Sequence, residues 1–179
     1  MKIIEALKEQ KRIQAKINRN AAQITQYSCK LSNEKPFFDS DEAQTAETYQ
    51  LIQSNIDLTN RYLWLKRCID HTNLNSKHEI GGVSYSITDL LNMKRNGIAF
   101  ILSTYNSLTD SQVSRRLASA RSTDSNAKQV QIERLYDERG KNEALLKWQE
   151  LLDNIDSKLE VINATTDLME LPEIPIVTL

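Results

Sequence analysis

The sequence contains few of the residues that make turns. Its 179 residues include only four glycines and three prolines, and aromatic residues make up 6%. Sandwiches, barrels and disordered linkers need many turn formers, so this composition disfavours all three classes. Long helices remain as the main element. We expect a single domain, because a chain of this length is of ordinary one-domain size.

Cysteines, long apolar runs and an excess of one charge are also lacking. Cys29 and Cys68 are the only two cysteines, which is typical of a thiol-reduced cytoplasmic protein. The first residues form no signal peptide, and no stretch approaches the roughly 20 apolar residues that span a bilayer. The 23 basic and 24 acidic side chains give a net charge of −1. Nucleic acid and membrane are therefore disfavoured as partners.

The pattern along the chain predicts a mainly α fold, in which long antiparallel helices form a coiled-coil-like bundle. Pro36 separates the first two helices, and a Gly81-Gly82 turn predicts a hairpin. We expect helices over 2–31, 41–75 and 89–108, a loop over 109–126 with a short helical turn near Leu117, and a small β-ribbon formed by about residues 77–86 and 128–136. Residues 1–171 form the helical domain, and 172–179 form an extended tail that could dock elsewhere.

The last helix carries the strongest pattern, an apolar repeat of 3.5 residues that is typical of a coiled-coil seam. It is ended by Pro172 and Pro175. The predicted seam for a homo-oligomer is Leu145, Trp148, Leu152, Ile155, Leu159 and Ile162, continued by Thr166 and Met169. The first 35 residues carry a net charge of +5 and residues 137–179 one of −6, which favours pairing of the first and last helices.

Residues 94–128 carry six basic side chains and two acidic ones, among many serines and threonines. Arginine forks, hydroxyls and an aromatic face suit a small phosphate-bearing ligand. The candidate ligand-binding residues are Arg95, Tyr105, Arg115, Arg116 and Arg121. The alternative is that these arginines pair with the acidic last helix, in the same chain or in a neighbouring subunit.

The sequence contains few residues and motifs that are typical of enzyme active sites. The chain has two histidines and no nucleophile motif, glycine-rich phosphate loop or dinucleotide fingerprint. Cys68, His71 and His78 have the chemistry of metal ligands, but a buried cysteine and a histidine near a helix C-terminus explain the same residues without a metal. We expect no enzymatic activity and no cofactor.

Three segments resemble the septicolysin-like proteins of bacteria and phages, which are small helical proteins of largely unassigned function. They are Ile56-Asp-Leu-Thr-Asn60, Gly82-Val-Ser-Tyr-Ser-Ile-Thr-Asp-Leu-Leu91 with Arg95 after it, and Ile155-Asp-Ser-Lys-Leu-Glu-Val-Ile-Asn-Ala-Thr-Thr-Asp-Leu168. Ala164 stands where the family pattern has Trp. The family name implies a lytic toxin, but nothing in the sequence supports membrane insertion.

Three functional hypotheses follow, from different classes. The first is a non-enzymatic, self-associating helical scaffold or binding protein. The second is a phage-type sponge that sequesters a small anionic nucleotide signal through the arginine-rich segment. The third is a metal-dependent hydrolase at Cys68, His71 and His78.

Overall fold

The computed structural model describes residues 1–123 and 130–175, and it divides the chain into two compact units. One unit contains Met1–Thr88 and Val161–Leu179, and the other contains Asp89–Glu160. The described residues are mainly helical and include one two-stranded antiparallel sheet, so the mainly α prediction is confirmed. The coiled-coil bundle stays a prediction.

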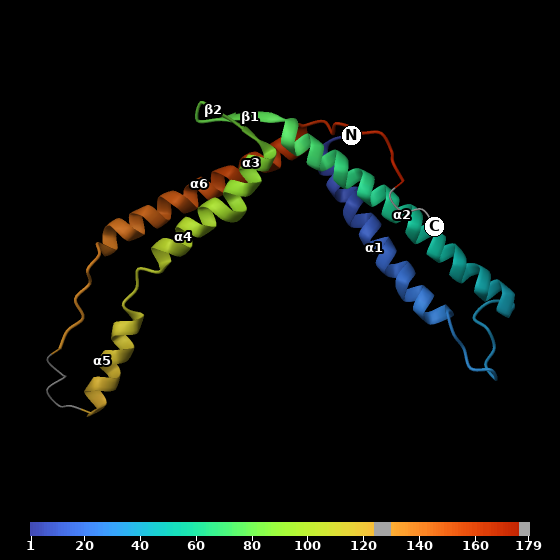
Figure 1. Cartoon of the computed structure of the whole chain (residues 1–179), viewed down its shortest axis with the longest axis horizontal. Helices are drawn as coiled ribbons and strands as arrows, with labels where there is room; N and C mark the ends of the chain where they lie inside the picture. Colours follow the sequence, from blue (N-terminus) through green and yellow to red (C-terminus); the bar gives the residue numbers. More distant parts are fainter. Residues whose placement is uncertain (124–129, 176–179) are drawn as a thin grey trace. The chain divides into compact units, whose positions relative to one another are not determined.

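Helices α1 (Ile3–Tyr27) and α2 (Asp41–Asn75) lie side by side in the first unit (Figure 1). The Ser40 hydroxyl caps α2 by accepting a hydrogen bond from the backbone N–H of Ala43, at 3.1 Å. Backbone and Ser40 hydrogen bonds at this terminus lower the pKa of Glu42. The helix therefore begins where its capping serine and acidic first turn predict.

The face that α1 buries contains polar residues as well as apolar ones. Its buried positions are Ile3, Ala6, Gln10, Ile13 and Asn20, with steps of three and four residues except for the last step of seven. The side-chain amide of Gln10 donates to the carbonyl of Tyr62 at 3.4 Å, and that of Asn20 donates to Asn55 Oδ1 at 2.9 Å. Buried polar groups with such partners set the register of α1 against α2.

The hairpin prediction is confirmed. Strands β1 (Lys77–Ile80) and β2 (Val83–Ser86) pair antiparallel, with His78 opposite Tyr85. Gly81 and Gly82 have φ values of 60° and 79°, the left-handed conformation that a two-residue hairpin turn requires. The glycine pair thus fixes the turn at the position read from the sequence.

The other arm of the predicted ribbon is wrong over residues 130–136, which form no strand; residues 128 and 129 lie outside the described residues. Alternation of apolar and polar residues suits a strand only when a sheet edge pairs with it. Here β1 and β2 pair with each other, and Arg134 instead forms ion pairs with Asp110 at 2.7 Å and Glu138 at 3.3 Å.

The helix predicted over 89–108 consists of three segments. They are α3 (Ile87–Asn92), the π-helical turn η1 (Met93–Gly97) and α4 (Ile98–Asn106). In η1 the backbone N–H of Ile98 donates to the carbonyl of Met93, which lies five residues earlier. Arg95 lies in this turn, a type of segment that often occurs at functional sites.

The loop predicted over 109–126 is wrong over Ser111–Thr123, where helix α5 extends well beyond the short turn expected near Leu117; residues 124–126 lie outside the described residues. Its first turn is closed by Asp110, whose carbonyl accepts from the N–H of Ser114 at 2.8 Å. The serines and threonines suggested a loop, but the arginines, alanines and Leu117 between them are good helix formers. The cap and these residues outweigh the serine content.

Helix α6 (Glu138–Thr165) ends before the predicted boundary, so Thr166 and Met169 do not extend its seam. The chain here pairs with the N-terminus: Lys2 and Asp167 form an isolated antiparallel bridge, and the N–H of Ile3 donates to the carbonyl of Thr166 at 3.1 Å. The first helix packs along α2. Backbone pairing, not proline, ends α6.

The segment after α6 runs along α2 and is held by its side chains. Thr72 Oγ1 accepts from the N–H of Met169 at 2.9 Å, and Cys68 Sγ accepts from the N–H of Leu171 at 3.3 Å. The indole of Trp64 donates to the carbonyl of Leu171 at 2.7 Å. Four residues of an α-helix and two residues of an extended chain both rise about 6 Å. The spacing between Cys68 and Thr72 on α2 therefore matches the spacing between Met169 and Leu171 in the tail.

Candidate interaction surface

The second unit has a small buried core. Its buried apolar side chains are Leu90, Ile98, Ile155 and Leu159. Among the residues described between Ala99 and Asn154, no side chain is buried. Helical stability in proteins comes mainly from packing of an apolar face, so the described part of this segment lacks the usual source of its stability.

Large apolar side chains instead remain open to solvent in this unit. Phe100 on α4 is 70% exposed and Leu146 on α6 is 64% exposed. Single exposed apolar residues are common, but here they accompany a segment with no buried position. The combination marks α4 and α6 as a candidate interaction surface.

The predicted seam residues divide into two groups on α6. Ile155, Leu159 and Ile162 are buried. Leu145, Trp148 and Leu152 are only half-buried. The N-terminal half of the seam therefore keeps apolar area that the described residues of its own chain do not cover.

A hollow of about 430 Å³ lies beside this half of the seam. Its lining comes from α4 and α6 and consists of Tyr105, Gly140, Glu143, Ala144, Lys147, Trp148 and Leu151. The two helices lie alongside each other (Figure 1), and an ion pair at 2.7 Å joins Lys94 of η1, the turn before α4, to Asp156 of α6. The Lys141 ammonium also donates to the carbonyl of Leu108 at 2.6 Å. These polar links hold the two helices together while the hollow stays open.

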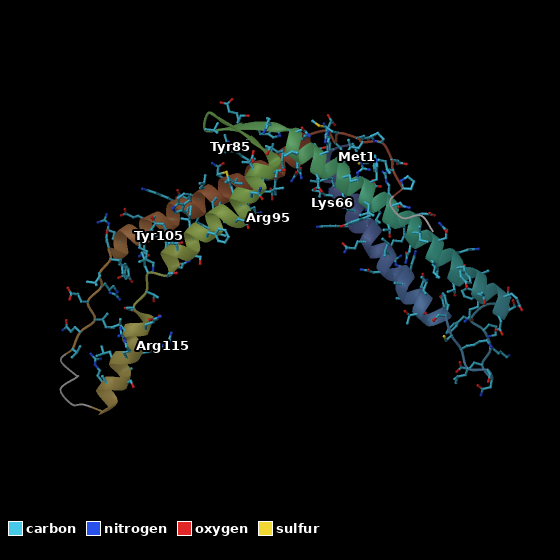
Figure 2. All side chains as sticks on the ribbon, in the orientation of Figure 1. Met1, Lys66, Tyr85, Arg95, Tyr105 and Arg115 are labelled. Carbon is cyan, nitrogen blue, oxygen red and sulfur yellow. The ribbon has the colours of Figure 1, made fainter. Side chains whose placement is uncertain are left out.

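The predicted ligand-binding residues are not gathered at one place. Arg95, Tyr105 and Arg115 lie on η1, α4 and α5, and Figure 2 shows them spread along the unit. Arg95 and Tyr105 are ten residues apart along the helix, which corresponds to about 15 Å. Tyr105 lines the hollow, whereas none of the four predicted arginines does.

The arginines differ in their partners. Arg121 donates to the carbonyl of Val130 at 3.0 Å. Arg95, Arg115 and Arg116 are exposed and form no ion pair with the described residues. Acidic partners in this region are taken by another cation, Arg134, whose pKa is raised by a hydrogen bond to Asp110 and by the charge of Glu138. Within the described residues of one chain, ion pairing with the last helix does not account for the three exposed arginines, and pairing with a neighbouring subunit stays a prediction.

The candidate metal ligands are also kept apart. Cys68 is fully buried in α2 and accepts a hydrogen bond from Leu171, whereas His71 is exposed and contacts Asn75. His78 lies in β1. Within residues 1–123 and 130–175, no group of three histidine, cysteine or acidic side chains is arranged to hold a metal ion.

Comparison with protein-family models, curated proteins and solved structures finds no match to this chain. No helix in the described ranges is both long and apolar enough to cross a membrane.

Two features escaped the sequence analysis. Phe100 and Leu146 lie outside the heptad positions, so no periodic pattern marked them as exposed apolar residues. The α2 groove that holds the tail depends on Thr72, Cys68 and Trp64, whose spacing of four residues places them on one helix face. That spacing can be read from the sequence, but it does not indicate which segment these three side chains bind.

Proposed function

We propose that this protein is a non-enzymatic helical scaffold that associates with further copies of itself through α4 and the N-terminal half of α6. One observation carries the proposal: the described residues between Ala99 and Asn154 contain no buried side chain. A second copy would supply the apolar contacts that the segment lacks.

The shape of the surface supports this partner. It offers a protruding aromatic side chain, Phe100, and a hollow lined by Tyr105 and Trp148 on the same unit. A two-fold interface uses the same patch on both subunits, and so needs projections and recesses within one patch. Aromatic side chains in such recesses commonly contribute most of the binding energy.

The test is light scattering on the wild type and on two matched variants. Leu146→Asp places a charge on the proposed surface, and Leu74→Asp places one on α2, where Leu74 is 60% exposed. We expect a mass above the 20.6 kDa of one chain for the wild type and for Leu74→Asp, and a shift to the monomer for Leu146→Asp. A wild type that is monomeric at every concentration contradicts the proposal.

A second candidate function is the binding of a small anionic nucleotide. Arg95, Arg115 and Arg116 have no ionic partner among the described residues, and Tyr105 lines an open hollow. Arginine is well suited to hold phosphate groups and an aromatic ring to stack on a base.

Calorimetry with a panel of nucleotides tests this second candidate. We expect heat of binding in the wild type that is lost in the double variant Arg115→Ala, Arg116→Ala and kept in Arg139→Ala, which removes an exposed arginine of α6 that already pairs with Glu143. Absence of heat with every nucleotide contradicts it.

A further inference from the structure

Helix α1 carries a stripe of positive charge on the side that does not pack against α2. The basic stripe consists of Lys8, Arg12, Lys16 and Arg19, at steps of four, four and three residues that place all four on one helix face. All four side chains are exposed. None forms an ion pair with the residues that the structure describes.

Helix α6 carries a stripe of the opposite sign. The acidic stripe consists of Glu150, Asp153 and Glu160, which are exposed and have no cationic partner in the described ranges. Steps of three and seven residues keep the three carboxylates on one helix face. The buried Ile155 and Leu159 lie between them in sequence on a different face.

The two stripes match in length as well as in sign. The basic stripe covers eleven residue steps, about 16 Å of helix, and the acidic stripe covers ten, about 15 Å. In the first unit α1 packs along α2, and neither stripe forms an ion pair with a described residue. Charges without an ionic partner among the described residues are available to a partner with the opposite pattern.

We propose that the basic stripe of one copy docks on the acidic stripe of a second copy. This inference rests on the proposed self-association. It adds to the apolar surface of α4 and α6 a polar contact that sets the orientation of one copy relative to the other. Complementary charged stripes fix register and accelerate encounter, and their effect is screened by salt.

A second copy is favoured over nucleic acid as the occupant of the basic stripe. A polyanion would pair with the basic stripe alone and leave the acidic stripe without a partner, and the whole chain has a net charge of −1. A second copy satisfies both stripes at once, because each chain carries one of each sign.

The experiment uses charge reversal and mixing. One full-length variant carries Arg12→Glu with Lys16→Glu, and another carries Glu150→Lys with Asp153→Lys. The control carries Lys35→Glu with Lys77→Glu, two exposed lysines of the first unit that have no ion pair with a described residue. Dissociation constants are measured by sedimentation equilibrium at low and high salt, and helix content is checked by circular dichroism.

We expect each reversal to weaken self-association about tenfold at low salt and much less at high salt, while the control stays within about twofold of the wild type. An equimolar mixture of the two reversed proteins should associate about as well as the wild type, because each reversed stripe then meets a stripe of the opposite sign. Recovery in the mixture shows that the contact is between chains.

Three results would overturn the inference. Association of both reversed proteins at wild-type strength overturns the stripe pairing but leaves self-association standing. Weakening by only one reversal, or no recovery in the mixture, shows that the two stripes do not pair with each other. A wild type that is monomeric throughout overturns the proposed function itself, and the inference with it.

Discussion

The two compact units of this chain stabilise their helices in different ways. In the first unit α1 and α2 bury an apolar seam around Ala6 and Leu65, and buried polar side chains such as Gln10 bond to the facing helix. In the second unit fewer apolar side chains are buried, and polar links join α6 to the residues that flank α4, such as Asp156 to Lys94 of η1 and Lys141 to the carbonyl of Leu108. The first unit has the larger buried core, and the second leaves large apolar side chains such as Phe100 and Leu146 exposed.

This difference shows what an apolar repeat predicts. The repeat in α6 is as regular as the buried positions of α1, yet Leu145 and Leu152 stay half-buried while Ile155 and Leu159 are buried. An apolar repeat indicates that one face of a helix can be buried. It does not indicate whether the surface that packs against this face belongs to the same chain or to another.

The largest expected effect is on the free energy of unfolding, when one large apolar side chain in each unit is truncated to alanine. Leu65→Ala, at a side chain with 0% exposure, should lower the free energy of unfolding by about 2–5 kcal/mol through lost burial and a cavity. Leu146→Ala should change it by less than about 0.5 kcal/mol at dilutions where the chain is monomeric. Urea melts measure both, and equal losses would contradict the comparison.

A medium effect concerns the polar links of the first unit. The side chain of Gln44 donates to the carbonyl of Tyr27 at 2.7 Å and accepts from the N–H of Phe37 at 2.8 Å. Gln44→Ala should cost about 1–3 kcal/mol, because these backbone groups lose their partner in a buried place. Gln53→Ala, which removes only an exposed hydrogen bond to Asp57, is the control. If thermal melts show the same small shift for both, the polar links do not stabilise this unit.

The smallest effect lies at the bridge between the chain's N-terminus and the end of α6. Lys2 lowers the pKa of Asp167, first through a side-chain hydrogen bond and then through its charge, with an ion pair at 2.8 Å. A lowered pKa in the folded state means that the contribution to stability is present above the ordinary aspartate range near about pH 4 and is lost as the pH falls through the folded value.

Lys2→Ala should therefore raise the pKa of Asp167 toward its ordinary range and flatten the acid limb of the stability profile. A titration followed by the NMR signals of the Asp167 carboxyl measures the shift directly. Lys66→Ala, which breaks an exposed ion pair with Asp70, should leave the pKa of Asp167 unchanged. An unmoved pKa in Lys2→Ala would show that Lys2 does not stabilise the carboxylate.

Local signals in the sequence predicted the elements that depend on neighbours in the chain. The Ser40 cap, the proline before it and the Gly81-Gly82 turn each act within a few residues, and the helix start and the hairpin follow from them. The α5 helix does not follow from such signals, because its serine and threonine content is typical of a loop, and the Asp110 carbonyl that accepts from the N–H of Ser114 is visible only in the structure.

Long-range partners could not be predicted in the same way. The buried face of α1 includes the polar Gln10 and Asn20, whereas the apolar Leu7 is exposed. Only the position of Tyr62 and Asn55 on the facing helix makes these polar residues suitable for burial. Likewise, the end of α6 is set by pairing with Lys2, which lies 165 residues before Asp167 in the chain.

The predicted ligand site shows the same limit. Nearness in sequence grouped Arg95 with Arg115, but the helices between them hold the two apart. In a helix each residue rises about 1.5 Å along the axis, so residues that are ten or twenty positions apart lie far from one another. They form one site only if the chain turns back on itself. Whether a second copy brings these arginines together stays a prediction.

The most direct test of the account is hydrogen exchange of the wild type at a series of protein concentrations. Amides of α4 and the N-terminal half of α6 should become more protected as concentration rises, because a second copy covers them, while amides in the α1 and α2 seam should keep the same protection throughout. Protection of α4 and α6 that is already high in dilute solution, and does not change with concentration, would contradict it.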